Sequence, residues 1–281
     1  MATSAFGDGI SFLVCPATRQ PLLADDHCLV VRGANERRYP VRDGIPILLP
    51  DGESDPSFES LHSAAAEPWH YSQRAAEILR HRSILSRVAS LRTAPGPTLD
   101  VGCSRGQLTR RLVEKFGSLA FIDLSFSAVH ATRETLPADK DTVCAVASAC
   151  ALPFADHTFG LLFACDGLAG WNLPDAQRRI ALAEFHRVLA PGGHAVLTDY
   201  LHPTQFPAWE RVVGESGLEV VAPLRFHDRL WYLLEARLAN WPAHFREAFS
   251  RSVFLAKGLA GISRALGDSG SNHLGMILRR T

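Results

Sequence analysis

The sequence lacks a net charge, a long apolar run and any Cys-x-x-Cys pair. Lysine plus arginine and aspartate plus glutamate both number 29, so the formal net charge is +0. A chain without net charge has no overall field to draw it onto a polyphosphate, which argues against nucleic acid as a partner. No apolar run approaches the roughly 20 residues that a membrane-spanning helix requires. We therefore expect no membrane span.

The beginning of the chain lacks a charged segment followed by a hydrophobic stretch, so it does not resemble a secretory signal. Together with the missing membrane span, this predicts a cytoplasmic protein. The cysteines are scattered, without a repeated pair, which indicates reduced thiols rather than a disulfide framework. They are Cys15, Cys28, Cys103, Cys144, Cys150 and Cys165.

What is present divides the chain into two parts. Residues 12–50 are short strand-like segments broken by turns at 25–26 and 43–44, and residues 51–57 have the polar, Pro/Gly-containing composition of a linker. The sequence therefore predicts a small β-rich module over 1–55 and a larger domain over 56–281. With 281 residues and 47% hydrophobic content, the chain is long enough for this division.

Strand-like and helix-like segments alternate in the larger part. A helical pattern over 68–91 comes first, and a long amphipathic helix from 175 is expected to stop at 191–193, a Pro-Gly-Gly sequence. Such alternation predicts an α/β fold with a Rossmann-like, doubly wound, mostly parallel sheet. Two closing strands are expected, with a helical insertion at 229–270 before the last one.

One strand-to-helix turn has the composition of a ligand-binding loop. A strand ending near Asp100 runs into Gly102, Ser104 and Gly106 before a helix, so backbone N–H groups there can approach a ligand closely. Asp123 ends the next strand, where a carboxylate can accept hydrogen bonds from a ribose. Two alternatives stay open: a purely structural turn, and Asp123 as a helix N-cap, a role that Ser125 could share.

Four motifs together resemble the class I S-adenosylmethionine-dependent methyltransferases of the small-molecule type. They are TLDVGCSRG (98–106), FIDLS (121–125), ALPFADHTFGLLF (151–163) and EFHRVLAPGG (184–193), and the resemblance runs from about 71 to 200. It implies S-adenosyl-L-methionine as the cofactor. It also implies that Asp100, Gly102, Cys103, Ser104 and Gly106 hold the methionine part, Asp123 the ribose, Leu124 and Ser148-Ala149 the adenine, and that Cys165-Asp166 face both cofactor and substrate.

The chain departs from that family's pattern at three positions. Ser148 stands where an acid usually meets the adenine, Gly160 where an acid follows the phenylalanine, and Gly170 where a histidine often stands. These changes leave cofactor binding expected and the site of methyl transfer harder to predict.

The cofactor is already an activated methyl donor, so the protein mainly aligns a nucleophile and excludes water. A general base is needed only for some acceptors. We expect Asp166, His202 and His227 to be catalytic, chosen from a wider set near the expected site that also holds Asp199, Tyr200 and Asp228. For each histidine, a structural or surface role is the alternative.

The expected activity is methyl transfer to a small, partly apolar molecule, as in secondary metabolism. The first alternative is an RNA base methyltransferase, suggested by the N-terminal module and by the arginines of residues 80–92, although a solvated helix face is the commoner explanation of such a run. The second is a cofactor-binding activator subunit without catalysis. The acceptor, the methylated atom and the oligomeric state are not determined by the sequence.

The N-terminal module gives a second resemblance. Residues 12–22 and 39–51 are similar to the zinc-ribbon-like domain of the activator subunit of tRNA, rRNA and protein methyltransferases. Zinc needs about four Cys or His ligands. Here only Cys15 remains of that set, with Thr18 at its partner position. We therefore expect a metal-free module that packs on or near the larger domain.

The insertion at 229–270 carries more aromatic and aliphatic residues than one helix face requires. Two explanations are open. The side chains pack the helices on the sheet or form a homodimer interface, or the insertion is a lid whose inner face forms an apolar acceptor pocket.

Overall fold

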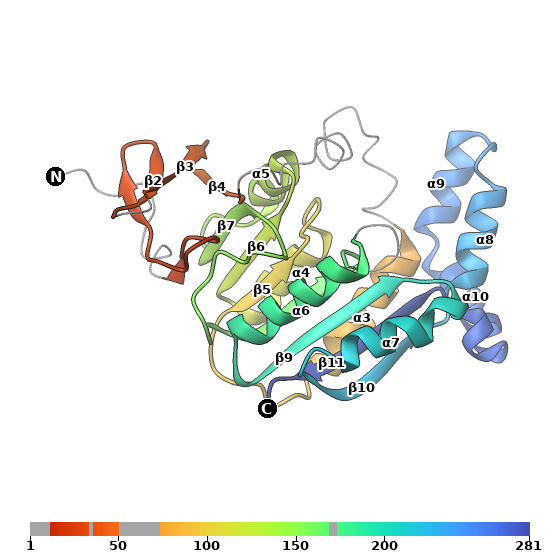
Figure 1. The fold of residues 1–281 in the computed structure, drawn as a ribbon. Coiled ribbons are helices and arrows are strands. Elements are labelled where there is room, and N and C mark those ends of the chain that lie inside the picture. The colour runs from red at the N-terminus through yellow and green to blue at the C-terminus, as the bar shows by residue number, and fades with distance from the viewer. Residues whose placement is uncertain (1–11, 34–35, 51–73, 169–172) are drawn as a thin grey trace.

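The computed structural model describes residues 12–33, 36–50, 74–168 and 173–281. The expected linker at 51–57, and Gly170, lie outside these residues. The strands form one eleven-stranded sheet in the order β1-β2-β3-β4-β7-β6-β5-β8-β9-β11-β10. Figure 1 shows the helices packed on both sides of this sheet.

The centre of the sheet is parallel. It contains β5 (Thr98–Val101), β6 (Leu119–Asp123), β7 (Thr142–Ala147), β8 (Phe159–Cys165) and β9 (Leu189–Tyr200), which pair in the order β7-β6-β5-β8-β9. Next to β9, β11 (His273–Arg279) runs antiparallel, and β10 (Glu219–Phe226) pairs antiparallel with β11. The predicted α/β, Rossmann-like, mostly parallel fold is confirmed, including the closing strand pair.

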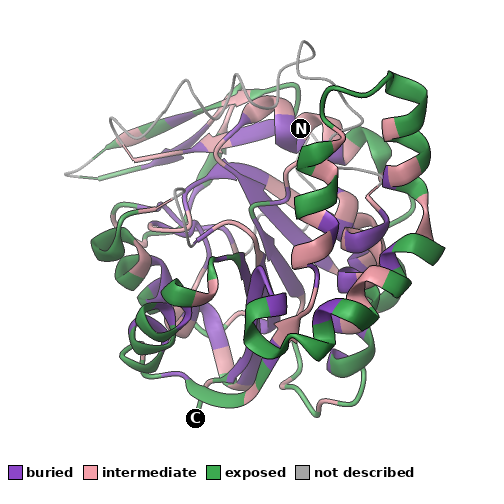
Figure 2. Ribbon diagram, turned by 90° about the vertical axis from the view of Figure 1, so that its right-hand side faces the viewer, coloured by how far each residue is buried: buried purple, intermediate pink, exposed green. Residues whose placement is uncertain are grey.

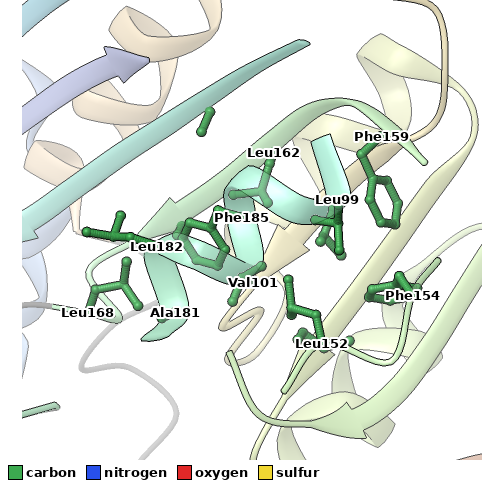
Figure 3. Close-up of a cluster of buried hydrophobic side chains, with 14 of the residues drawn as sticks. Leu99, Val101, Leu152, Phe154, Phe159, Leu162, Leu168, Ala181, Leu182 and Phe185 are labelled. Atoms are coloured by element: carbon green, nitrogen blue, oxygen red, sulfur yellow. The ribbon is translucent and has the colours of Figure 1, made fainter. Parts of the chain in front are cut away.

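Two hydrophobic cores cover the two faces of the sheet. On one face, α3 (Ala75–Val88), α4 (Gln107–Phe116) and α5 (Phe126–Thr135) contribute side chains to a core with the strands. On the other face, α6 (Asp175–Val188) and α7 (Phe206–Gly214) do so. Figure 3 shows α6 packing Phe185 and Leu182 toward Leu162 and Leu99. Burial of apolar surface stabilises the folded state by roughly 25 cal/mol per Å². The two cores therefore hold the strands, and with them the strand ends, in a fixed arrangement.

The helix α6 ends earlier than its sequence suggests. It stops at Val188, and Leu189 already pairs with Phe159 as the first residue of β9. Nearby, a Cβ on Gly160 would lie 2.2 Å from the Ala94 carbonyl oxygen. Gly160 is one of the departures from the family pattern. A side chain at this position would clash with the backbone of the loop that leads into β5.

The N-terminal strands join the same sheet. They are β1 (Leu23–Asp25), β2 (Cys28–Val31), β3 (Arg37–Arg42) and β4 (Ile45–Leu48), and β4 pairs parallel with β7. Arg19 donates to the Leu152 carbonyl at 2.8 Å and forms an ion pair with Glu184 at 2.9 Å. The module is thus bound to the larger part through backbone pairing, a shared core and a salt bridge.

Three helices form the insertion: α8 (Arg229–Arg237), α9 (Ala243–Arg251) and α10 (Val253–Ala265), followed by the short η3 (Gly267–Gly270). Trp231 is buried and stacks on Phe249 with ring centroids 4.4 Å apart. Trp231 and Ala256 pack with Ala75 and Ala76 of α3. The inner face of the insertion therefore packs on α3, and Tyr232 of α8 also contacts the sheet through the rings of Tyr200 and His273.

Candidate functional site

The candidate site lies at the carboxyl edge of the parallel strands. Because β5 to β9 run in one direction, the residues that follow their last positions share one edge of the sheet. The antiparallel β11 begins at the same edge, since His273 pairs with Tyr200. Residues from distant parts of the chain therefore meet here.

The turn between β5 and α4 is built on left-handed backbone conformations. Gly102, Ser104 and Gly106 have φ values of 80°, 48° and 76°. The N–H groups of Gly102 and Cys103 both donate to the Ile122 carbonyl, at 2.9 and 3.0 Å. A Cβ on Gly106 would lie 2.9 Å from Thr132 of α5, whereas a Cβ on Gly102 would meet nothing within 4 Å. The turn is therefore packed at its helix end and open at Gly102.

Asp123 joins this turn to the next strand. Its Oδ2 accepts a hydrogen bond from the Ser104 N–H at 2.9 Å, and its Oδ1 accepts one from the Ser125 N–H at 3.0 Å. The N-cap of α5 is Ser125, whose hydroxyl accepts from the Ala128 N–H at 3.1 Å. The helix cap is thus supplied by Ser125. An ionised carboxylate accepts several hydrogen bonds at once, and Asp123 uses both of its oxygens in this way.

Asp100 is buried beneath the turn. Its Oδ2 accepts a hydrogen bond from the Thr109 hydroxyl of α4 at 2.6 Å, and its exposed fraction is 2%. Burial raises its pKa to about 7, with the charge of Asp123 acting in the same direction. A cationic group placed beside Asp100 would favour its ionised form.

The remaining predicted cofactor residues follow the same edge. Leu124 directly follows β6 and is half-buried, and Ser148 and Ala149 directly follow β7. The Ser148 hydroxyl accepts from the Cys150 N–H at 3.1 Å, which fixes this turn locally. Cys165 is the last residue of β8, and burial raises the pKa of its thiol. The sheet thus brings all ten predicted cofactor residues to one edge.

Asp166, the first of the predicted catalytic residues, follows β8 with a φ of 61°. Arg80 of α3 donates from Nη2 to its Oδ2, and the Thr198 hydroxyl donates to its Oδ1 at 3.2 Å. The Asp166 side chain keeps an exposed fraction of 30%, whereas that of Arg80 is 3%. The two hydrogen bonds therefore fix the orientation of the Asp166 carboxylate, which remains partly exposed to solvent.

Sequence reasoning missed the network behind Asp166. Arg80 Nη1 lies 2.9 Å from His273 Nε2 and 3.5 Å from Asp228 Oδ2, and His273 Nδ1 lies 2.5 Å from the same Asp228 oxygen. Although burial alone would raise it, the pKa of Asp228 is lowered by His273 and Arg80. Arg80 belongs to the arginine-rich segment 80–92, in which other arginines such as Arg82 are exposed. The sequence therefore did not indicate that Arg80 is buried.

The two predicted catalytic histidines have local partners. His202 is exposed and caps η2 (Pro203–Gln205), and its Nδ1 lies 2.9 Å from the Thr204 hydroxyl. His227 follows β10, and its Nδ1 lies 3.1 Å from the Ser271 hydroxyl. Both follow strands that end at the site's edge, and each ring keeps its Nε2 as a further donor or acceptor.

In the N-terminal module, Cys15 lies in a hydrogen-bonded turn. Its Sγ lies 3.1 Å from the Tyr39 hydroxyl and accepts from the Thr18 N–H at 3.4 Å. Cys28 lies elsewhere and donates to the Asp25 carbonyl at 3.1 Å. Within the described part of the chain, no group of three or more His, Cys, Asp or Glu residues could hold a metal ion. In the same residues, no helix combines the length and apolar character of a membrane span.

The residues at the edge fit a nucleoside with a charged tail. Gly102 leaves room for a ligand above the turn, Asp123 offers carboxylate oxygens, and the buried Asp100 would be stabilised by a cation. These acceptor carboxylates suit S-adenosyl-L-methionine, which carries ribose hydroxyls and a sulfonium. The carboxylates lie at the ends of neighbouring strands, where α/β folds bind such ligands.

Comparison with known proteins agrees with this geometry. Residues 99–197 match the family model described as a methyltransferase domain. The 2-methyl-6-phytyl-1,4-hydroquinone methyltransferase of Synechocystis sp. is 35% identical over 133 residues, which are 44% of this chain and 40% of that protein. The chain thus spans less than half the length of this relative.

A solved structure and a shorter relative complete the comparison. The N-methyltransferase NodS from Bradyrhizobium japonicum WM9, solved with S-adenosyl-L-homocysteine, aligns with a TM-score of 0.55 and 18% identity, over 80% of this chain and 99% of that one. A UPF0434 protein of Maricaulis maris is 54% identical over 44 residues, which are 15% of this chain and 68% of that protein. Residues 99–197 therefore match a methyltransferase domain, the larger part has the fold of that solved N-methyltransferase, and the chain belongs to the UPF0434 family through a stretch of 44 residues.

Proposed function

We propose that this protein is an S-adenosylmethionine-dependent methyltransferase that acts on a small, partly apolar molecule. The observation that carries the proposal is the hydrogen bond from the Ser104 N–H to the Asp123 carboxylate, in the same turn as Gly102, where a Cβ would meet no atom within 4 Å. A relative named for a phytyl hydroquinone supports an acceptor that combines a small reactive ring with an apolar part.

The cofactor supplies a methyl group already activated by the sulfonium. The chain's residues hold and orient it. With the cofactor bound, Asp123 would accept hydrogen bonds from the ribose hydroxyls, and the positive charge of the methionine part would favour the ionised form of Asp100. The remaining contacts come from the turn and the neighbouring strand ends: Gly102, Cys103, Ser104, Gly106, Leu124, Ser148, Ala149 and Cys165.

On the acceptor side, Asp166 is the group with the best-defined orientation, because Arg80 and Thr198 both bond to its carboxylate. Held by these two donors, Asp166 orients an acceptor hydroxyl or amine by accepting its hydrogen bond. His227 and His202 are the candidates for a proton acceptor when the nucleophile must lose a proton.

For the rest of the chain, we propose a zinc-ribbon-like module over 1–55 without bound metal, a catalytic domain over 56–281, and a cytoplasmic protein. The hydrogen bond between Cys15 and Tyr39 supports a module that closes this turn without an ion. Elemental analysis of the purified protein tests this point, and stoichiometric zinc would overturn it.

Two measurements test the function. Calorimetric titration with S-adenosyl-L-homocysteine measures cofactor binding, and transfer of a labelled methyl group to a prenylated hydroquinone, with other small phenols and amines as a panel, measures activity. We expect both binding and turnover. Binding without turnover on any acceptor would indicate a non-catalytic protein, and salt-dependent methylation of RNA would indicate the alternative substrate.

A further inference from the structure

The exposed large hydrophobic side chains are concentrated in the insertion. Thirteen are exposed in the described part of the chain, and eight of them lie between 229 and 266: Leu233, Leu234, Trp241, Phe245, Phe254, Leu255, Ile262 and Leu266. Figure 2 views the molecule from the side that carries α8, α9 and α10, where long stretches of helix are exposed. Large apolar side chains exposed in one part of a chain are a feature of interaction sites.

On α10 these side chains share one side of the helix. Phe254, Leu255, Ile262 and Leu266 are exposed, and Phe254 reaches an exposed fraction of 86%. At 100° per residue, they fall within an arc of roughly 120°, which we call the α10 face. Ala256 and Ser263, on the opposite side, are buried. The helix is therefore apolar on its outer side although its inner side is already packed.

The insertion contains more basic than acidic side chains. Residues 229–270 contain six lysines and arginines and three acids. Each acid is ion-paired: Glu235 with Arg74, Glu247 with Arg251 and Asp268 with Arg225. Lys257 and Arg264 are exposed on α10, about 60° and 80° around the helix from Phe254 at one edge of the α10 face, and neither forms an ion pair with any residue that the structure describes. The insertion of this neutral chain thus has a net positive charge, and it also carries most of the exposed large hydrophobic side chains.

We propose that the α10 face docks on the surface of an anionic lipid bilayer. Apolar side chains flanked by lysine and arginine are the composition of helices that lie in the membrane interface, where the apolar face enters the headgroup region and the cations meet anionic lipids. A second copy of the chain fits less well. A two-fold contact through this face would bring the basic side chains of α10 into one interface twice, and α10 itself contains no acid that could compensate them.

The test is cosedimentation of the full chain with vesicles. Vesicles of phosphatidylcholine with about a third phosphatidylglycerol should bind the protein, and binding should fall several-fold with phosphatidylcholine alone or at high salt. The double variant Phe254→Ser/Ile262→Ser should lower binding by about tenfold or more, because two apolar side chains no longer enter the interface. The variant Lys257→Glu/Arg264→Glu should lose binding to the anionic vesicles, and its weak binding to vesicles of phosphatidylcholine alone should equal that of the unaltered protein.

The matched control is Leu23→Ser/Ile180→Ser, since both side chains are 50% exposed and lie outside the insertion. It should bind vesicles as the unaltered protein does. An unaltered protein that does not bind anionic vesicles, or a control that loses as much binding as the α10 variant, would overturn the proposal. A concentration-dependent dimer that the Phe254→Ser/Ile262→Ser variant abolishes, without vesicle binding, would instead identify a second copy as the occupant.

This inference does not rest on the proposed function. Vesicle binding is measured without cofactor or acceptor, and the α10 variants should bind S-adenosyl-L-homocysteine with unchanged affinity. A failure of membrane docking is therefore distinguishable from a failure of methyl transfer.

Discussion

At the residue scale, the Asp123 carboxylate holds the β5–α4 turn and the start of α5 in one arrangement through two backbone N–H groups. Because the same carboxylate is proposed to bind the ribose, its removal affects the ligand directly. Asp123→Ala should weaken binding of S-adenosyl-L-homocysteine by about 1–3 kcal/mol, as the loss of a charged hydrogen-bond partner does. Calorimetry measures this change. The exposed Asp139→Ala is the control, and equal affinities would show that the ribose binds elsewhere.

Asp100 should make the stability depend on pH. Its pKa rises from 3.8 to about 7 on folding, so between these values the unfolded chain releases a proton that the folded chain keeps. The free energy of unfolding should therefore fall by about 1–4 kcal/mol as the pH rises through this window, and should level off above it.

Asp100→Asn cannot ionise and should remove that part of the pH dependence. Urea denaturation of both proteins at about pH 5 and about pH 8, without cofactor, measures the difference. An equal loss of stability in both proteins would mean that Asp100 is ionised in the folded state.

Arg80 compensates the charges of two carboxylates, Asp166 and Asp228. Removing one partner of a buried ion pair leaves an uncompensated charge, which costs about 3–5 kcal/mol. Arg80→Met should therefore lower the free energy of unfolding by that amount. Arg82→Met, two residues along the same helix but exposed, should change it by less than about 0.5 kcal/mol. Denaturant unfolding compares the two, and similar values would mean that the network contributes little.

At the element scale, the insertion is attached to α3 by the buried Trp231 and its stack on Phe249. Trp231→Ala should destabilise the protein by about 3–5 kcal/mol, because it leaves a cavity between α8, α9 and α3. Trp241→Ala is the matched control, since that ring is 52% exposed. Hydrogen exchange should show faster opening of α8 to α10 in the first variant only. Equal effects would mean that the attachment depends on other contacts.

At the scale of the whole molecule, the N-terminal strands and the larger part share one sheet and one core. The β4–β7 pairing and the Arg19–Glu184 ion pair cross between them. We expect one calorimetric unfolding transition with equal calorimetric and van't Hoff enthalpies. Leu48→Ala, at a fully buried position of β4, should lower the midpoint of that single transition. Two separate transitions would show that the module folds independently.

The sequence alone determined most of the alternating strands and helices of the larger part and the turn of residues 98–106, because these depend on local periodicity and on small residues, whereas α7 was not predicted. The position of Asp123 was also predictable. It ends the next strand, and parallel pairing of neighbouring strands places its carboxylate beside the turn. The closing strands were also predicted, while the exact end of α6 was not, since Leu189 is recruited by pairing with Phe159.

The tertiary structure decided what distant residues do to one another. Arg80 is buried because Asp166, Asp228 and His273, from strands and turns far along the chain, surround it. Likewise, Phe254 is exposed and Trp231 is buried although both belong to apolar helical segments. Periodicity shows that a segment has apolar side chains, but which of them face water depends on the elements that pack against it.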